Sequence, residues 1–172
     1  MKMSFINKIK SSFNSDSRRD LWVINKLRTL KKDLKILDAG CGSQRYKKYC
    51  SHLKYYSQDF GKYTNDLKRT LSKSTVGGHD SYEYGILDYV GDIWDISEKS
   101  NTFDYILCTE VFEHIPYPDK AFKELSRLLK VNGYLILTLP STSLRHMDPF
   151  YFYSGFSDRW LEHFCEKFNL KI

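Results

Sequence analysis

The chain has 172 residues, a length that suits one domain with a sizeable hydrophobic core. Its formal net charge is +6, but no block of five or more like charges occurs, so a basic nucleic-acid-binding tail is excluded. No apolar run is long enough for a secretory signal or a membrane span. The four cysteines form no Cys-x-x-Cys pair, which predicts reduced thiols in a cytoplasmic protein.

The first 34 residues are expected to be helical. In residues 1–16, apolar side chains recur at helical spacing with lysines between them, which predicts an amphipathic helix. Such a helix could bind a membrane surface, but a loosely packed N-terminal helix is the interpretation we favour. A second helix is predicted over 18–30. Its apolar stripe consists of Leu21, Ile24, Leu27 and Leu30.

A strand, a glycine-rich turn and a helical segment follow in residues 35–50. Ile36 and Leu37 form an apolar run typical of a buried strand, and Gly40 and Gly42 come directly after it. This order is typical of a nucleotide-binding α/β sheet, whose ligands lie beyond the carboxyl ends of the strands. The third glycine of the dinucleotide fingerprint is replaced by Arg45, which disfavours nicotinamide and flavin dinucleotides.

The acidic residues around this turn indicate the kind of ligand. Asp38 stands just before the glycines, where a carboxylate repels phosphate but attracts an ammonium or a sulfonium. A strand is predicted over 53–58, and Asp59 ends it about 20 residues after Asp38, the spacing at which an acid holds ribose hydroxyls. Residues 60–85 are polar and glycine-containing, and we expect a long loop near the substrate entrance.

The second half of the chain alternates strands and helices. Strands are predicted over 86–90, 103–109 and 134–139, and helices over 119–130 and 158–168. Asn132-Gly133 is expected to end the first of these helices. A loop over 141–155 carries His146 and a cluster of aromatic residues, and residues 169–172 are expected to begin another strand.

Several stretches together resemble one family. Leu37-Asp38-Ala39-Gly40-Cys41-Gly42 is similar to motif I of class I S-adenosylmethionine-dependent methyltransferases, in a methyltransferase-11-like subgroup. Val90-Gly91-Asp92-Ile93 and Glu110-Val111-Phe112-Glu113-His114-Ile115 resemble later motifs of the family, in the family's order. The resemblance runs from about residue 35 to 156. It divides the chain into an N-terminal helical segment, 1–34, and a methyltransferase domain, 35–172.

The resemblance implies a fold and a cofactor. The fold is α/β, a doubly wound, mostly parallel, Rossmann-like sheet, here apparently lacking its last one or two strands. A sheet edge left exposed in this way invites pairing into a homodimer. The cofactor implied is S-adenosyl-L-methionine, with S-adenosyl-L-homocysteine as product, and no metal site is predicted. The positions implied to bind the cofactor are Asp38, Gly40, Cys41, Gly42, Asp59, Phe60, Asp92, Ile93 and Glu110.

The resemblance also implies a reaction, transfer of a methyl group to an oxygen or nitrogen of a small-molecule or glycan-like acceptor. His146 and His114 are the candidate general bases, since histidine accepts protons near neutral pH. Each could equally be a loop histidine bonded to the backbone. Two alternatives stay open: a non-catalytic binding or assembly module with the same fold, and an RNA methyltransferase. A nucleic-acid partner is disfavoured, because no base-flipping motif or appended RNA-binding domain occurs.

Overall fold

The computed structural model describes residues 15–63 and 83–172. The expectations for residues 1–14 and for most of the 60–85 loop lie outside the described residues. Within the described part, five parallel strands form one sheet in the order β3-β2-β1-β4-β5, as the predicted α/β fold requires. The strands are β1 (Lys35–Ala39), β2 (Lys54–Asp59), β3 (Tyr89–Val90), β4 (Phe103–Thr109) and β5 (Leu129–Thr138).

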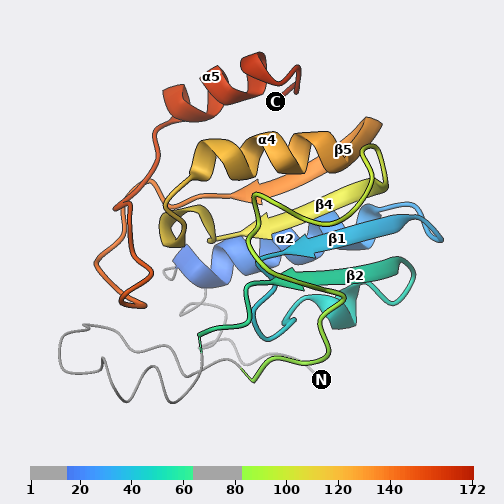
Figure 1. The fold of residues 1–172 in the computed structure, drawn as a ribbon. Coiled ribbons are helices and arrows are strands. Elements are labelled where there is room, and N and C mark those ends of the chain that lie inside the picture. Colours follow the sequence, from blue (N-terminus) through green and yellow to red (C-terminus); the bar gives the residue numbers. More distant parts are fainter. Residues whose placement is uncertain (1–14, 64–82) are drawn as a thin grey trace.

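Helices cover both faces of this sheet, so the domain has three layers (Figure 1). Helix α2 (Ser15–Thr29) lies behind the sheet, and α4 (Pro118–Leu128) lies in front of it. Helix α5 (Asp158–Lys167) packs beyond α4. Two short 3-10 helices, η1 (Lys47–Tyr49) and η2 (Phe112–His114), follow β1 and β4. The helical segment expected at the end of residues 35–50 is only the single 3-10 turn η1.

The sheet is apolar on both faces because both faces are covered. Successive side chains of a strand point to opposite sides. Leu37 and Ile106 thus join the cluster under α4, whereas their neighbours Ile36 and Leu107 join the cluster under α2. All four are fully buried. This explains why β1 and β4 have continuous apolar runs rather than alternating patterns.

Helix α2 buries most of its predicted apolar stripe: Leu27 is fully buried, and Ile24 and Leu30 pack partly buried against the same cluster. Val23 and Leu27 are completely buried against Ile36 and Leu107, whereas Leu21 is 51% exposed. The prediction was wrong at Leu21, whose place in the buried face is taken by Val23. Val23 and Leu27, four residues apart, lie on the same side of the helix and face the sheet, whereas Leu21 is turned toward solvent.

Three predicted boundaries were wrong. The strand predicted over 86–90 contains only Tyr89 and Val90, and Ile86 is exposed. Helix α4 ends at Leu128, and β5 begins at once because Leu129 pairs with Phe103. Asn132-Gly133 therefore lies within an irregular part of β5 instead of ending the helix. The added residues form a bulge before regular pairing resumes at Tyr134.

The chain end also differs from the prediction, because residues 169–172 form no strand. The backbone turns back instead, with the Leu170 amide donating to the Cys165 carbonyl, and Phe168 stacks on Phe122 of α4. The four cysteines are free and buried, as expected of reduced thiols. Across 15–63 and 83–172, no helix is both long and apolar enough to cross a bilayer.

The packing of α5 on α4 gives a first test. Phe122 is fully buried and contacts Phe112, Trp160 and Phe164 at ring-centroid distances of 6.0–6.3 Å. Phe122→Ala should lower the free energy of unfolding by about 3–5 kcal/mol, the usual range for a buried phenylalanine. Val131→Ala, at an 83% exposed position, is the matched control and should change it by less than about 0.5 kcal/mol. Equal urea-unfolding midpoints for the two variants would contradict this packing.

Candidate active site

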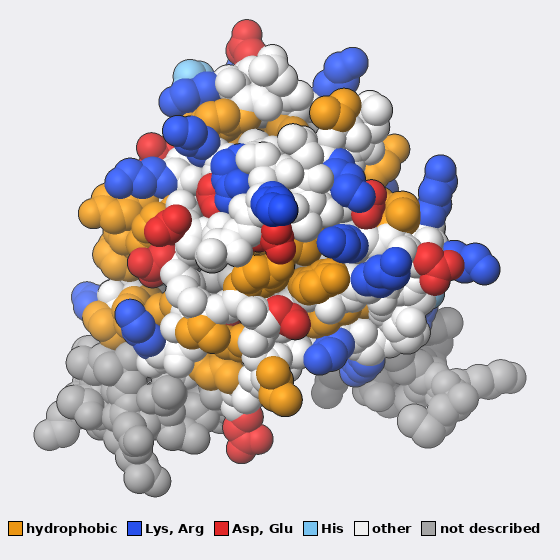
Figure 2. Space-filling view, turned by 45° about the vertical axis from the view of Figure 1, so that its right-hand side comes forward, with side chains coloured by type: hydrophobic (Ala, Val, Ile, Leu, Met, Phe, Trp, Pro, Cys, Tyr) orange, Lys and Arg blue, Asp and Glu red, His pale blue; other side chains and the backbone are white. Residues whose placement is uncertain are grey.

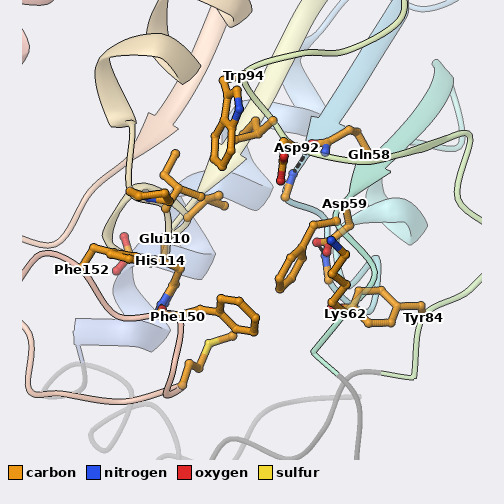
Figure 3. Close-up of a pocket in the computed structure, with 18 residues that line it drawn as sticks. Gln58, Asp59, Lys62, Tyr84, Asp92, Trp94, Glu110, His114, Phe150 and Phe152 are labelled. Atoms are coloured by element: carbon orange, nitrogen blue, oxygen red, sulfur yellow. Dashed lines mark hydrogen bonds between the residues drawn. The ribbon is translucent and has the colours of Figure 1, made fainter. Parts of the chain in front are cut away.

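A pocket of about 250 Å³ lies beyond the carboxyl ends of β1, β2 and β4, and we call it the central pocket. The strand order reverses between β1 and β4, which is where ligands bind in sheets of this kind. Figure 3 shows Gln58, Asp59 and Lys62 on one wall and Glu110 and His114 on the other. The predicted cofactor positions that line this pocket are Gly40, Gly42, Asp59, Phe60, Asp92, Ile93 and Glu110.

Asp38 and Cys41, which were also predicted to bind the cofactor, do not line the central pocket. Asp38 is 2% exposed and accepts a 2.6 Å hydrogen bond from the Tyr55 hydroxyl. Cys41 is buried, and its amide donates to the Gln58 carbonyl at 3.0 Å. Their roles in cofactor binding stay predictions.

The end of β2 holds the glycine turn in place. The Gly40 amide donates to both the carbonyl and the side-chain oxygen of Gln58, at 2.9 and 3.1 Å. The Gly42 amide donates to Asp59 Oδ2 at 2.9 Å. Gln58 also donates from Nε2 to the Gly91 carbonyl at 2.7 Å, which fixes the loop after β3. Sequence reasoning missed Gln58, although its place beside Asp59 at a strand end was an available signal.

Two features of the structure leave no room for a side chain at position 40, namely the backbone conformation of Gly40 and its close approach to Val111. The φ of Gly40 is +70°, which disfavours any side chain. A Cβ there would also lie 2.5 Å from Cγ2 of Val111, in the loop after β4. The turn after β1 and the loop after β4 thus approach each other closely, and this contact closes the floor of the central pocket.

Asp59 is oriented by four donors. Its carboxylate accepts from the Gly42 amide, from the Gly61 amide at 3.1 Å, from the Phe60 amide and from the Tyr84 hydroxyl. Burial raises the pKa of this carboxyl above its ordinary value, and these hydrogen bonds partly offset the shift. Asp59 lines the central pocket, so a ligand hydroxyl there would meet a carboxylate that is already held in position.

The opposite wall is built from the loop after β4 and the 141–155 loop. Glu110 has a φ of +51°, and its Oε2 lies 3.1 Å from Nη1 of Arg19. His114 follows in η2, and its Nδ1 lies 2.7 Å from the Phe150 carbonyl oxygen. Phe150 comes from the 141–155 loop and also packs edge-to-face on Phe60. Segments distant in sequence therefore meet across the central pocket.

The second predicted histidine lies next to the first. His146 borders a larger, open cavity of about 1100 Å³, which we call the side groove and which Glu110 and Glu113 also line. The His146 ring packs edge-to-face on His114 with 4.6 Å between ring centroids. Its Nδ1 lies 2.8 Å from the Leu144 carbonyl oxygen. The structure thus brings both candidate bases together where the central pocket and the side groove meet.

Glu113 completes this corner, and sequence reasoning gave it no role. It is 1% exposed, and its Oε1 lies 3.7 Å from Nε2 of His114. Burial raises the pKa of the Glu113 carboxyl to about 7; Glu110 adds to the shift and Arg19 opposes it. The position of Glu113 directly before His114 was a signal that it lies near the candidate base. The proximity of His146 depends instead on how the 141–155 loop folds.

Comparisons with known proteins agree with this architecture. A family model described as "Methyltransferase domain" matches residues 37–137. An uncharacterized protein of Methanocaldococcus jannaschii is 31% identical over 109 residues, which are 63% of this chain and 42% of that protein. The chain therefore spans about two fifths of the length of this curated relative.

Solved structures show the same fold. A putative methyltransferase from Bacillus halodurans aligns with a TM-score of 0.59 at 20% identity, over 86% of this chain and 67% of that one. Phosphoethanolamine N-methyltransferase 2 of Haemonchus contortus, in complex with S-adenosyl-L-methionine, aligns with a TM-score of 0.58 at 19% identity. That match covers 88% of this chain and 36% of the worm enzyme.

The buried Asp38 predicts a pH-dependent stability. Burial raises the pKa of its carboxyl from 3.8 to about 7; the Tyr55 hydrogen bond and Arg45 oppose the shift, and Asp59 adds to it. Between these values the folded chain keeps a proton that the unfolded chain loses, so stability falls as pH rises from about 4 to 7. Asp38→Asn removes this loss and still offers Tyr55 an acceptor oxygen.

The stability difference between Asp38→Asn and the wild type should therefore shift in favour of the variant from pH 4.5 to pH 8. The shift should be at most about 4 kcal/mol, since one pKa unit corresponds to about 1.36 kcal/mol. Urea unfolding at the two pH values measures it. If the stability difference between the variant and the wild type is the same at pH 4.5 and pH 8, Asp38 is already ionised in the folded chain at pH 4.5.

Proposed function

Because the chain belongs to the class I S-adenosylmethionine-dependent methyltransferase family, we propose that it binds S-adenosylmethionine in the central pocket and methylates an acceptor there. The acceptor is an oxygen or nitrogen of a small-molecule or glycan-like compound, and the product is S-adenosylhomocysteine. The observation that carries the proposal is the convergence of Gly40, Gly42, Asp59, Asp92 and Glu110 on one pocket. The worm enzyme's complex with S-adenosyl-L-methionine supports the choice of cofactor.

We assign the adenosine part of the cofactor to the ends of β2 and β3. Asp59 accepts from the ribose hydroxyls, because its carboxylate lines the pocket and is held in position by backbone donors. The Asp92 carboxylate accepts from the adenine amine, and the Ile93 amide donates to a ring nitrogen. Phe60 and Trp94 supply apolar surface on the pocket wall for the adenine ring.

The methionine part then lies along the glycine turn. The ammonium of the cofactor pairs with Glu110, whose carboxylate lies on the pocket wall opposite Asp59. His114, which lines the central pocket near its boundary with the side groove, would face the methyl end of the cofactor. Since Glu110 borders both cavities, the acceptor can reach the methyl group through the side groove while the cofactor fills the central pocket.

Methyl transfer is an in-line displacement: the carbon–sulfur bond breaks, a bond to the acceptor forms, and a neutral thioether leaves. The cofactor is already activated, so the protein supplies proximity and orientation, which contribute up to about 7–11 kcal/mol. The acceptor proton passes to the histidine pair. The Leu144 and Phe150 carbonyls can only accept, so each Nδ1 carries the hydrogen and each Nε2 has the lone pair that takes a proton.

The surface charge supports a small acceptor rather than a nucleic acid. On the face shown in Figure 2, Lys and Arg side chains are interspersed with Asp and Glu and form no single stripe. A protein that tracks a nucleic-acid backbone concentrates its basic residues in one groove or patch. The net charge of +6 is therefore consistent with a solubilising surface on this face.

The cofactor assignment predicts the effect of changing Asp59. Asp59→Ala should raise the dissociation constant for S-adenosylmethionine at least tenfold, because hydrogen bonds to a charged group contribute about 1.5–3 kcal/mol each. Isothermal titration calorimetry measures this directly. Asp119→Ala, an exposed acid in the first turn of α4, is the control and should bind normally.

Asp59→Asn keeps the shape of the side chain and should also bind weakly, which separates lost charge from lost packing. The proposal fails if both Asp59 variants are folded and bind the cofactor as the wild type does. A wild-type chain that binds the cofactor but methylates nothing in an acceptor screen would instead indicate a binding module.

A second prediction concerns the acceptor proton. His146→Ala should lower turnover by about 10²–10⁴-fold, the usual size of a proton-transfer contribution, with cofactor affinity little changed. His163→Ala, on the exposed side of α5, should keep the wild-type rate. The measurement is a radiolabelled methyl-transfer assay with any acceptor that turns over. Wild-type turnover in both His146→Ala and His114→Ala would show that neither histidine takes part.

A further inference from the structure

We propose that Glu113, His114 and His146 form a binding site for one divalent transition-metal ion, at the junction of the central pocket and the side groove. One ligand atom from each of these residues lies within 4.8 Å of the other two. Two come from η2 and one from the 141–155 loop. Imidazole nitrogens and a carboxylate are the ligands that zinc and related ions bind.

The orientation of both histidines fits metal ligands. A histidine that binds a metal almost always donates its other ring N–H to a carbonyl, a carboxylate or water. His114 directs Nδ1 to the Phe150 carbonyl at 2.7 Å, and His146 directs Nδ1 to the Leu144 carbonyl at 2.8 Å. Both contacts fix the tautomer with the lone pair on Nε2, the atom that would bind the ion.

The Glu113 side chain supplies an independent observation. Its exposed fraction is 1%, and among the described residues no hydrogen-bond partner reaches its Oε2. A buried carboxyl group is normally neutralised, paired or bound to a metal, because an unpaired buried charge is costly. Arg19, the nearby cation, forms its ion pair with Glu110. An ion between Glu113 and the histidines would satisfy this carboxylate.

The spacing favours an ion over a direct Glu113–His114 bond. Oε1 of Glu113 and Nε2 of His114 are 3.7 Å apart, too far for a hydrogen bond. Two ligands of a tetrahedral ion, each bound at about 2.1 Å, are separated by roughly 3.4 Å. The two atoms therefore stand close to the separation of ligands that share one ion.

Hydrogen bonds tie the loop that carries His146 to η2. The amides of Phe152 and Tyr153 both donate to the Glu113 carbonyl, at 2.8 and 3.3 Å. Within the loop, the Tyr151 hydroxyl donates to the Ser143 carbonyl at 2.6 Å, and the Tyr151 ring lies against both histidines. The third ligand is thus held near the first two by backbone contacts that do not involve the ligand atoms.

Three protein ligands leave a further position open on the ion, as in catalytic zinc sites. His114 lines the central pocket and His146 the side groove, so this position faces the place where methyl donor and acceptor meet. If the proposed function holds, an acceptor hydroxyl bound there would lose its proton readily, because a metal ion lowers the pKa of a bound hydroxyl. The histidines would then hold the ion instead of accepting the proton.

The test measures the metal directly and needs neither cofactor nor acceptor. The full, untagged chain is stripped with a chelator and titrated calorimetrically with Zn²⁺, and separately with Mg²⁺, which prefers oxygen ligands. We expect one Zn²⁺ per chain and much weaker binding of Mg²⁺. Glu113→Gln and His146→Ala should each weaken Zn²⁺ binding by at least about a hundredfold, since even losing an outer-shell partner typically costs ten- to a hundredfold.

His163→Ala is the control and should bind Zn²⁺ as tightly as the wild type. The Co²⁺-substituted protein should show intense visible absorption bands, and these should be lost in His146→Ala. Wild-type Zn²⁺ affinity in folded Glu113→Gln or His146→Ala, or the absence of stoichiometric Zn²⁺ binding, overturns the proposal. A chain that binds Zn²⁺ at this site but not S-adenosylmethionine would overturn the proposed function and leave the metal site standing.

Discussion

The hydrogen bonds from the end of β2 to the turn after β1 are the constraint on which the site depends. The glycine amides of this turn must be satisfied before the turn can hold one shape. Gln58 and Asp59 satisfy them, and Gln58 also fixes the loop after β3. The same hydrogen bonds therefore fix the end of β2, the shape of the turn and one wall of the pocket, and they are formed without a ligand.

Much of the fold could be predicted from the sequence, because its central elements have strong local signals. The apolar runs of β1 and β4 and the periodic pattern of α4 indicated buried elements, and all were confirmed. The errors lie where tertiary contacts decide. Leu129 leaves the helix because Phe103 is available to pair with it, and Val23 rather than Leu21 is buried because of how α2 meets the sheet.

Some residues of the candidate site could likewise be predicted from the sequence, and others could not. Positions that directly follow a strand, such as Asp59 and Asp92, could be placed in the pocket because parallel strands end at one edge of a sheet. The proximity of His146 to Glu113 and His114 could not be predicted. The 141–155 loop has no repeating pattern, and its position is set by contacts between its backbone and η2.

The ion pair between Arg19 and Glu110 connects the first described helix to the pocket wall. A cation that binds Glu110 from inside the pocket competes with Arg19 for the same carboxylate. Occupancy of the pocket and docking of α2 are then thermodynamically coupled, and linkage makes that coupling equal in both directions. If the proposed pairing of a ligand ammonium with Glu110 displaces Arg19, whatever strengthens the Arg19–Glu110 ion pair would weaken ligand binding, and whatever weakens that pair would strengthen it. The helix would thereby act as a built-in competitor of the ligand.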